Sequence, residues 1–231
     1  MAEHIHPINC SDCICKADLF SDLPPDDFDI ICRTKQDVEF NAGEIIFKQG
    51  AVLTHVVCLT QGLAKIYFEG IEKKNLILRL VKPSELVGGP GMFVDRRHHY
   101  SLGAVADCKV CFIDVAAYRE VVFKNKKLAH EVMNRESQHR IELYTKLVNL
   151  TQKQMPGRIA EVLMYLYGEV YNSTKFNCAL SRQEIADLSA MSKESAIRIL
   201  KDFKDEGYIT LDGNDFEIFN VEALAQISNL G

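Results

Sequence analysis

The sequence predicts an α+β fold with an antiparallel β-roll first, a long helix next and a small helical domain with a β-hairpin last. Short β-type runs separated by Gly, Asn, Asp or Pro fill the first half of the chain. A helical pattern with an apolar stripe follows, and then come two capped helical segments and a glycine-punctuated strand pair. We place the three parts at residues 1–115, 116–153 and 154–231. The 231 residues are enough for two domains that each bury a core.

The first part opens with a short helical lead-in from Leu19 to Cys32, which is broken at Pro24-Pro25. Short strands at regular spacing then predict a small antiparallel roll or barrel. These strand-like runs cover residues 38–47, 55–59, 63–68, 76–80 and 110–113.

A long helix is predicted from about Ala116 to about Lys153. Four-three-four spacing marks a seam on it that is typical of helix pairing. The seam consists of Ser137, Ile141, Tyr144 and Val148. A second stripe, suited to cover the roll, consists of Leu143, Leu147 and Leu150. Two stripes indicate a helix that packs on its own domain and on a second copy, and burial within one subunit is the alternative.

The last part carries local signals for two helices and a hairpin. Ser181 and Glu184 form a capping box, and Ser192 can cap the next helix in the same way. After Gly207, two strand-like runs flank Asp212-Gly213. The apolar residues at helical spacing on the second helix are Ala196, Ile199, Leu200 and Phe203. This is the pattern of a winged helix-turn-helix, which lays its second helix in the DNA major groove.

The outward face of that second helix carries residue types that read bases. Glu194 can accept a hydrogen bond from cytosine N4, and Arg198 can donate two to guanine. An ordinary helix salt bridge between these two side chains is the alternative. Lys201 and Lys204 are better suited to phosphates, which set the register on DNA. The predicted DNA-contacting residues are Arg182, Ser192, Lys193, Glu194, Ser195, Ile197, Arg198, Lys201 and Lys204.

At these residues the chain resembles the CRP/FNR family of bacterial transcription regulators, and it is closer to the FNR-like branch. The run from Ser181 to Leu200 is similar to the family's helix-turn-helix signature, and Gly157-Arg158-Ile159-Ala160 matches a second marker. Residues 43–50, 61–62 and 88–93 resemble the turns of the family's cyclic-nucleotide-type β-roll. The resemblance covers nearly the whole chain.

The resemblance implies a homodimer in which the long helix forms the interface. Two recognition helices would then meet a palindromic site about one DNA turn apart, roughly 34 Å. Double-stranded DNA is the implied partner, with RNA polymerase as a further one. Residues 154–157 are expected to form the hinge, because Pro156 fixes the direction in which the next helix starts.

The signal sensed by the roll is expected to differ from cyclic AMP. The cyclic-AMP branch of the family has a Glu after a Gly and an Arg-Ser pair that grips the cyclic phosphate. Gly89 stands at the Glu position, and Tyr100-Ser101, or His99, stands at the pair. Arg96 and Arg97 lie earlier in the loop and do not align with the gripping Arg, so the resemblance does not supply the cationic fork that a cyclic phosphate needs. The candidate effector pocket consists of Gly88, Gly89, Met92, Tyr100, Ser101 and Tyr144.

The cysteines indicate redox or gas chemistry as the signal. Cys10, Cys13 and Cys15 lie near the start of the chain, and Cys111 lies on a predicted strand. This resembles the oxygen-sensing branch, in which three N-terminal cysteines and one distant cysteine ligate a [4Fe–4S] cluster. Cys15 departs from the pattern, because the family places its third ligand near the position of Leu19. Thiol redox chemistry, a zinc site and no bound metal are the alternatives.

Other classes of function fit the sequence less well. A haem ligated by His98, His99 or His55, or an effector-independent regulator, are alternatives within the family. A cupin-like metalloenzyme needs histidines and a carboxylate that converge on one face, and the seven His show no such spacing within a strand. We therefore expect a protein that is not an enzyme. A partner-binding module that no longer contacts DNA is the third option.

The charge distribution limits how the last part of the chain can contact DNA. Residues 154–231 hold seven Lys/Arg and twelve Asp/Glu, a net charge of −5, whereas residues 1–153 are neutral. DNA-binding domains are usually basic, so positive charge should concentrate on the recognition helix, with few phosphate contacts. The chain has no 18-residue apolar run and no secretory signal, and its eight cysteines then indicate thiols or metal ligands. We expect a cytoplasmic protein.

Overall fold

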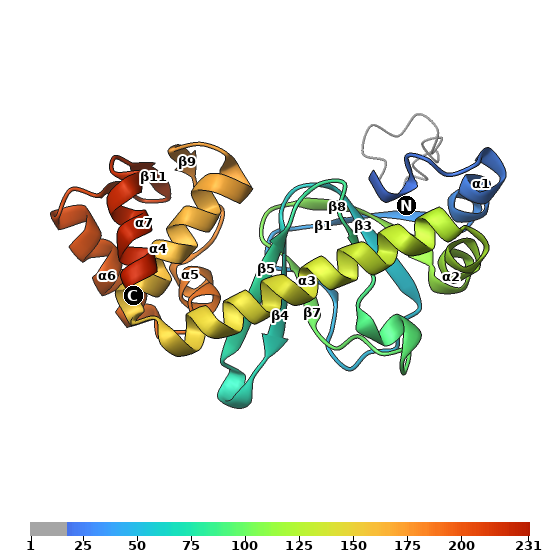
Figure 1. Ribbon diagram of the computed structural model, residues 1–231, viewed down its shortest axis with the longest axis horizontal. Coiled ribbons are helices and arrows are strands. Elements are labelled where there is room, and N and C mark those ends of the chain that lie inside the picture. Colours follow the sequence, from blue (N-terminus) through green and yellow to red (C-terminus); the bar gives the residue numbers. More distant parts are fainter. Residues whose placement is uncertain (1–17) are drawn as a thin grey trace. The chain divides into compact units, whose positions relative to one another are not determined.

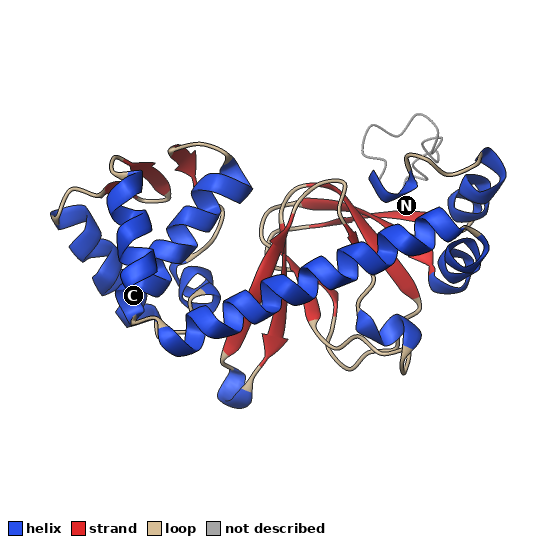
Figure 2. Cartoon of the chain, viewed as in Figure 1, coloured by secondary structure: helices blue, strands red, loops and turns tan. Residues whose placement is uncertain are grey.

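The computed structural model describes residues 18–231, which form two compact units (Figures 1 and 2). The first unit comprises residues up to 66 together with 81–139. The second comprises residues 67–80 together with 140–231. The predicted mixture of helices and antiparallel sheet is confirmed. No helix in the described range is both long enough and apolar enough to cross a membrane.

The lead-in of the first unit is helical, as predicted, with η2 (Asp18–Phe20) before the proline pair and α1 (Pro25–Arg33) beginning at its second proline. Helix α1 starts at Pro25 because a proline at the first helical position loses no hydrogen bond. Ion pairs hold the lead-in in place. Buried Asp27 accepts from Lys124 at 2.7 Å, and Asp22 accepts from Lys127 at 2.6 Å. The hydrogen bond with Asp27 raises the pKa of Lys124.

Eight strands and two short helices build the roll. They are β1 (Gln36–Phe40), β2 (Ile45–Phe47), β3 (His55–Gln61), β4 (Ala64–Glu69), η3 (Ile71–Lys73), β5 (Asn75–Val81), β6 (Leu86–Val87), η4 (Pro90–Phe93), β7 (Ser101–Ala104) and β8 (Cys108–Asp114). Two four-stranded sheets result, with the orders β1-β8-β3-β6 and β2-β7-β4-β5.

The run predicted over 38–47 is two strands, because a turn interrupts it. The Glu44 N–H donates to the Asn41 carbonyl at 3.1 Å, and the Glu44 carboxylate accepts from the Asn41 N–H at 2.6 Å. Strands β6 and β7 were not among the predicted runs.

The helical segment predicted over 116–153 consists of two helices, α2 (Val115–Lys124) and α3 (Lys126–Gln152). Asn125 separates them. Its backbone is extended, and its side chain accepts from the N–H groups of Lys127 and Leu128, so it caps the second helix. The core of the first unit joins both helices to one face of the β1-β8-β3-β6 sheet. Its members include Val56, Ile113, Tyr118, Val121, Leu128 and Val132.

The second unit holds the winged domain. Its elements are α4 (Met155–Tyr165), the π-helical η5 (Leu166–Tyr171), β9 (Lys175–Asn177), α5 (Arg182–Leu188), α6 (Lys193–Asp205), β10 (Ile209–Asp212), β11 (Asp215–Ile218) and α7 (Val221–Leu230). The predicted hairpin of β10 and β11 is present, and β9 adds a third strand beside β11. Helix α7 packs on α4. Their contact needs a glycine at 157, where a Cβ would lie 2.7 Å from the Cα of Gly231.

Candidate nucleic-acid interface

Local capping fixes the start of helix α5. The Ser181 hydroxyl accepts from the Glu184 N–H at 3.2 Å, and the Glu184 carboxylate accepts from the Ser181 N–H at 2.7 Å. This reciprocal pair is the predicted capping box. The Ser189 hydroxyl donates back to the Ile185 carbonyl at 2.9 Å where the helix ends. Both ends of the first helix of the motif are therefore defined by its own sequence.

Helix α6 is oriented by the same chemistry and by its apolar face. The Ser192 hydroxyl accepts from the Ser195 N–H at 3.2 Å, so it is occupied as the helix cap. The apolar stripe predicted for the second helix is buried on α6: Ala196, Ile199, Leu200 and Phe203. Burial of this stripe leaves the opposite face to solvent.

Glu194 and Arg198 lie on that exposed face, one helical turn apart. No ion pair joins the two side chains in the described part of the chain, so both keep their hydrogen-bonding groups available. Lys193, Ile197 and Lys201 are exposed beside them. The face thus offers a guanidinium, a carboxylate and ammonium groups, which can contact base edges and phosphates.

Arg182 holds the wing. Its guanidinium donates to the Gly213 carbonyl at the wing turn and lies over the Phe216 ring, 5.1 Å from the centroid. One guanidinium nitrogen, Nη1, is buried without a hydrogen-bond partner, and burial lowers the pKa of the group. Lys204 also reaches the wing, where it donates to the Leu211 carbonyl at 2.8 Å. Two residues predicted to contact DNA therefore have structural partners within the domain.

A stack of three aromatic rings packs within the winged domain, and the sequence analysis did not predict it. The Tyr171 and Phe176 rings stack at 4.6 Å, and Phe176 stacks on Phe216 at 5.6 Å. Because Arg182 covers the other end, the stack joins η5, β9, β11 and the first residue of α5. No local spacing reveals contacts between residues that are so far apart in the sequence.

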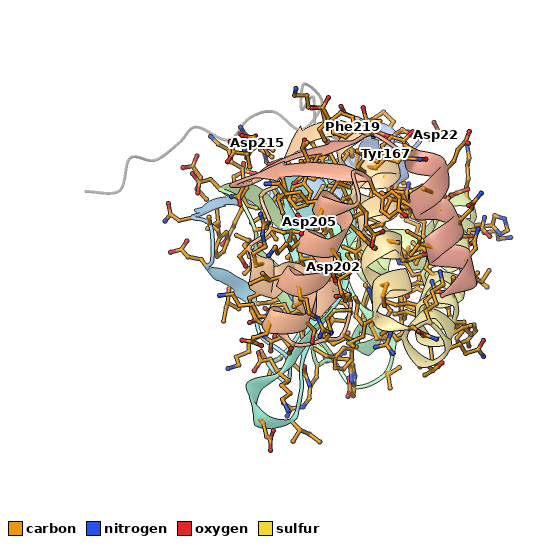
Figure 3. All side chains as sticks on the ribbon, turned by 90° about the vertical axis from the view of Figure 1, so that its left-hand side faces the viewer. Asp22, Tyr167, Asp202, Asp205, Asp215 and Phe219 are labelled. Atoms are coloured by element: carbon orange, nitrogen blue, oxygen red, sulfur yellow. The ribbon has the colours of Figure 1, made fainter. Side chains whose placement is uncertain are left out.

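Acidic residues flank the recognition face. Figure 3 labels Asp202 and Asp205 on α6 and Asp215 on the wing, and all three side chains are exposed. They fall at the C-terminal half of α6 and on β11. The basic residues are therefore interleaved with carboxylates toward the end of the helix, which agrees with the net charge of −5 of residues 154–231.

The residues around the predicted hinge form a polar cluster that the sequence did not reveal. Lys146 of α3 donates to the Leu188 carbonyl at 3.1 Å, at the end of α5. Burial lowers the pKa of Lys146 to about 8, despite the opposing attraction of Glu161. Glu161 accepts from Lys153 at 2.7 Å and from Ser228. Although burial acts to raise the pKa of Glu161, these partners lower it overall.

The apolar seam predicted on the long helix is exposed in a single chain. Ile141, Tyr144 and Val148 are 56, 61 and 48% exposed. Leu143 and Leu147, expected to cover the roll, are exposed as well. Helix α3 therefore presents apolar side chains over about two turns, from Ile141 to Val148.

The residues of the predicted effector pocket contact one another and neighbouring backbone. Gly89 has φ +85°, and a Cβ there would lie 3.0 Å from the Tyr100 hydroxyl oxygen. Ser101 is buried, and its hydroxyl accepts from the Gln49 N–H at 2.9 Å. Beside Gly88, Met92 is buried in the core of the first unit. Tyr144, the remaining predicted pocket residue, belongs to the second unit.

The adjacent histidines occupy different environments. His98 is buried and stacks on Phe47 with the ring centroids 3.8 Å apart, and its Nδ1 has no hydrogen-bond partner. Burial lowers the pKa of His98 to about 4, so the ring is neutral at physiological pH. His99 is exposed and pairs with Asp95 at 3.1 Å. His55 contacts the Thr54 hydroxyl at 2.9 Å. Of the two adjacent histidines, His99 therefore lies at the surface, whereas His98 is enclosed beside Phe47.

Cys111 is the single predicted metal ligand within the described residues, since Cys10, Cys13 and Cys15 lie outside them. It is half-buried on β8, where the strand register places it opposite Cys58 on β3. Between residues 18 and 231 no group of three or more His, Cys, Asp or Glu side chains is arranged to hold a metal ion.

Comparisons with known proteins agree with this architecture. Residues 37–125 match the family of cyclic nucleotide-binding domains, and residues 157–227 match the Crp-like helix-turn-helix domain. A CRP-like cAMP-activated global transcriptional regulator of Mycobacterium tuberculosis is 22% identical over 92% of this chain and 97% of its own length. The anaerobic regulatory protein of Bacillus subtilis is 25% identical over 84% and 87%. The structure of FixK2 from Bradyrhizobium japonicum superposes with a TM-score of 0.77 at 15% identity, over 84% of this chain and 96% of that one.

Proposed function

Since the chain belongs to the CRP/FNR family of transcription regulators, we propose that it is a dimeric regulator that reads a palindromic DNA site and responds to a redox or gas signal. The proposal rests on the exposed face of helix α6, whose first turn is capped by Ser192. Arg198 and Glu194 are the base-reading residues, and Lys193 and Lys201 contact phosphates. The exposed seam on α3 is the surface that a second copy covers. RNA polymerase is a further partner.

Cyclic AMP is not the effector in this proposal, although the relative from M. tuberculosis is named as cAMP-activated. A side chain at position 89 would be strained by the positive φ, and its Cβ would crowd the Tyr100 hydroxyl oxygen at 3.0 Å. Ser101 is engaged by the backbone of Gln49, and His99 faces Asp95. None of these groups supplies the paired cationic donors that a cyclic phosphate requires.

A [4Fe–4S] cluster is the proposed redox or gas sensor, held by Cys111 together with Cys10, Cys13 and Cys15. Leu19 and Phe20 are buried in the same core that Cys111 packs against. Cys15 is four residues from Leu19, so the chain reaches at most about 14 Å from that anchor. This short tether favours ligation near Cys111. When bound, such a cluster supplies one-electron redox chemistry and sensitivity to oxygen.

The test is fluorescence anisotropy on a palindromic duplex that contains TGA half-sites, with a duplex of scrambled sequence as the control, over a range of salt concentrations. We expect binding that is at least about a thousandfold tighter to the palindrome, the lower end of the usual range for specific regulators. Equal affinity for both duplexes would refute base reading and favour a partner-binding module. The cluster is tested separately, by iron analysis and absorbance after anaerobic purification, and colourless, iron-free protein would remove it.

A further inference from the structure

Cys58 and Cys111 face each other across two neighbouring strands of the first unit. The register of β3 and β8 pairs them directly, one step from the pair Val57 and Phe112. Cys58 is 4% exposed, whereas Cys111 is half-buried. Both belong to the core between the sheet and the helices, so their side chains lie on the same face of the sheet.

The pair occupies a hydrogen-bonded position of the ladder. The Leu59 N–H donates to the Glu85 carbonyl, and the Leu59 carbonyl accepts from Ser84, so Leu59 faces β6. Because consecutive residues direct their backbone groups to opposite neighbours, Cys58 directs its groups toward Cys111. Such pairs have Cα atoms about 5.5 Å apart, which lies within the usual range for disulfides.

A bond between these two sulfurs is strained. Facing Cβ atoms in a sheet lie about 4.5–5.5 Å apart, whereas a relaxed disulfide brings them to about 3.8 Å. The strands must draw together locally before the bond closes. Strained disulfides are reduced easily, and they are the labile and regulatory ones.

We propose that Cys58 and Cys111 form a reversible cross-strand disulfide when the protein meets hydrogen peroxide. The sulfur of Cys111, the more exposed of the two, attacks one peroxide oxygen. The O–O bond breaks, one water leaves, and Cys111 becomes a sulfenic acid. The sulfur of Cys58 then attacks the sulfur of Cys111, the S–O bond breaks, and a second water leaves with the thiol proton of Cys58. The two thiols together lose two electrons, which reduce the peroxide to water.

The disulfide would act on the start of α3. Leu128 and Val132 of that helix pack in the same core as Cys58. Drawing β3 and β8 together therefore changes the surface on which the first turns of α3 rest. This thiol switch goes beyond the proposed cluster because it requires neither iron nor the N-terminal cysteines. Its consequence for transcription rests on the proposed function, whereas bond formation does not.

The chain offers a matched control in Cys108, three residues earlier on β8. Its register partner on β1 is Phe40, and its thiol donates to the Leu63 carbonyl at 3.3 Å. Burial raises the pKa of this thiol. Since it is an odd number of residues from Cys111, Cys108 lies on the other face of the sheet. Cys108→Ala should leave the proposed bond intact.

The experiment uses the full chain with Cys10, Cys13 and Cys15 replaced by Ser, which removes three of the four proposed cluster ligands and keeps the thiol of Cys111. Reduced protein is treated with hydrogen peroxide, and its peptides are mapped by mass spectrometry. We expect a cross-linked peptide pair that contains Cys58 and Cys111, a loss of about 2 Da, and full reversal by dithiothreitol. Amide exchange of residues 126–132 should change on oxidation and return on reduction.

Variants distinguish the role of the Cys58 sulfur from that of the Cys111 sulfur. In Cys58→Val, which keeps an apolar side chain in the core, Cys111 should stop at a sulfenic acid that dimedone traps, and amide exchange in α3 should not respond. The inference is overturned if the parent protein instead links Cys111 to Cys32, or if both sulfurs are alkylated separately after oxidation. DNA affinity of the same samples is measured independently, so loss of the disulfide and loss of the proposed function are distinguished.

Discussion

Arg198 and Lys201 differ in what they can contact, although both are basic and exposed on α6. A guanidinium donates two parallel bonds to guanine, whereas an ammonium serves phosphates as a point charge. Arg198→Ala should therefore cost about 1–3 kcal/mol on the specific palindrome and relax the preference at one base pair. Lys201→Ala should weaken binding to specific and scrambled duplexes by a similar factor.

Anisotropy titrations on the palindrome, on single-base variants of it and on scrambled DNA measure both effects. If Arg198→Ala lost equal affinity on every duplex, Arg198 would be a phosphate contact and base reading would lie elsewhere on α6.

Lys146 should make stability depend on pH. Its pKa is lowered from 10.5 to about 8 in the folded chain, so between these values the unfolded chain holds a proton that the folded chain has lost. The free energy of unfolding then rises with pH across this window, by roughly 3 kcal/mol in total, and below pH 8 this gain is absent because Lys146 is protonated in both states. Lys146→Met removes the titrating group and should flatten the rise.

Urea unfolding at pH 7.5 and at pH 10 measures this difference. Lys201→Met, at an exposed position on α6, is the control and should keep the wild-type rise. Identical pH profiles for wild type and Lys146→Met would show that Lys146 is solvated in the folded protein.

At the scale of elements, the exposed seam on α3 should mediate dimer formation. Tyr144→Asp places a charge in the middle of the seam, and two-fold symmetry places it there twice. Loss of two buried apolar side chains at about 1.5 kcal/mol each should raise the dimer dissociation constant roughly a hundredfold. Glu142→Ala, at an exposed position outside the seam, should leave it unchanged.

Sedimentation velocity over a range of protein concentrations reads the dimer constant directly. If the Tyr144→Asp protein dimerises as tightly as the wild type, the dimer interface lies on another surface.

The elements that the sequence predicted well are those defined by local chemistry. Ser181, Glu184 and Ser192 act on backbone groups three residues away, so their pattern is visible in a short window. Strand β7 escaped prediction because Ser-Leu-Gly-Ala has neither β-branched residues nor polar–apolar alternation. The sheet partners of β7, not its own residues, make it a strand.

The parts of the candidate site that the sequence missed depend on distant partners. Arg182 reads as a DNA contact until the wing turn brings the Gly213 carbonyl and Phe216 to it. Nothing in the segment around Lys146 indicates that it is buried, because its partner is the Leu188 carbonyl at the end of α5. The facing of Cys58 and Cys111 depends on strand register, which neither segment specifies alone.

At the scale of the whole molecule, the acidic winged domain should bind DNA with a shallow salt dependence. If Lys193 and Lys201 of each protomer neutralise phosphates, the logarithm of the association constant should fall against the logarithm of salt concentration with a slope of about −4. Lys201→Ala should make the slope less negative by about two.

Titrations between 50 and 300 mM salt, on the palindrome and at constant pH, give the slope. A slope near −10 would mean that the dimer contacts phosphates through basic residues well beyond the recognition helices. The net negative charge of residues 154–231 would then not limit the number of phosphate contacts.

The backbone at Gly89, more than the neighbouring ring, limits which residues this position can hold. Its φ of +85° is one that residues with a side chain rarely adopt, so any of them would be strained there. A Cβ would also lie 3.0 Å from the Tyr100 hydroxyl oxygen, and that side chain would have to shift by a few tenths of an ångström. An acidic residue at this position would therefore lower the stability of the fold, and only a ligand that binds the folded state could offset that loss.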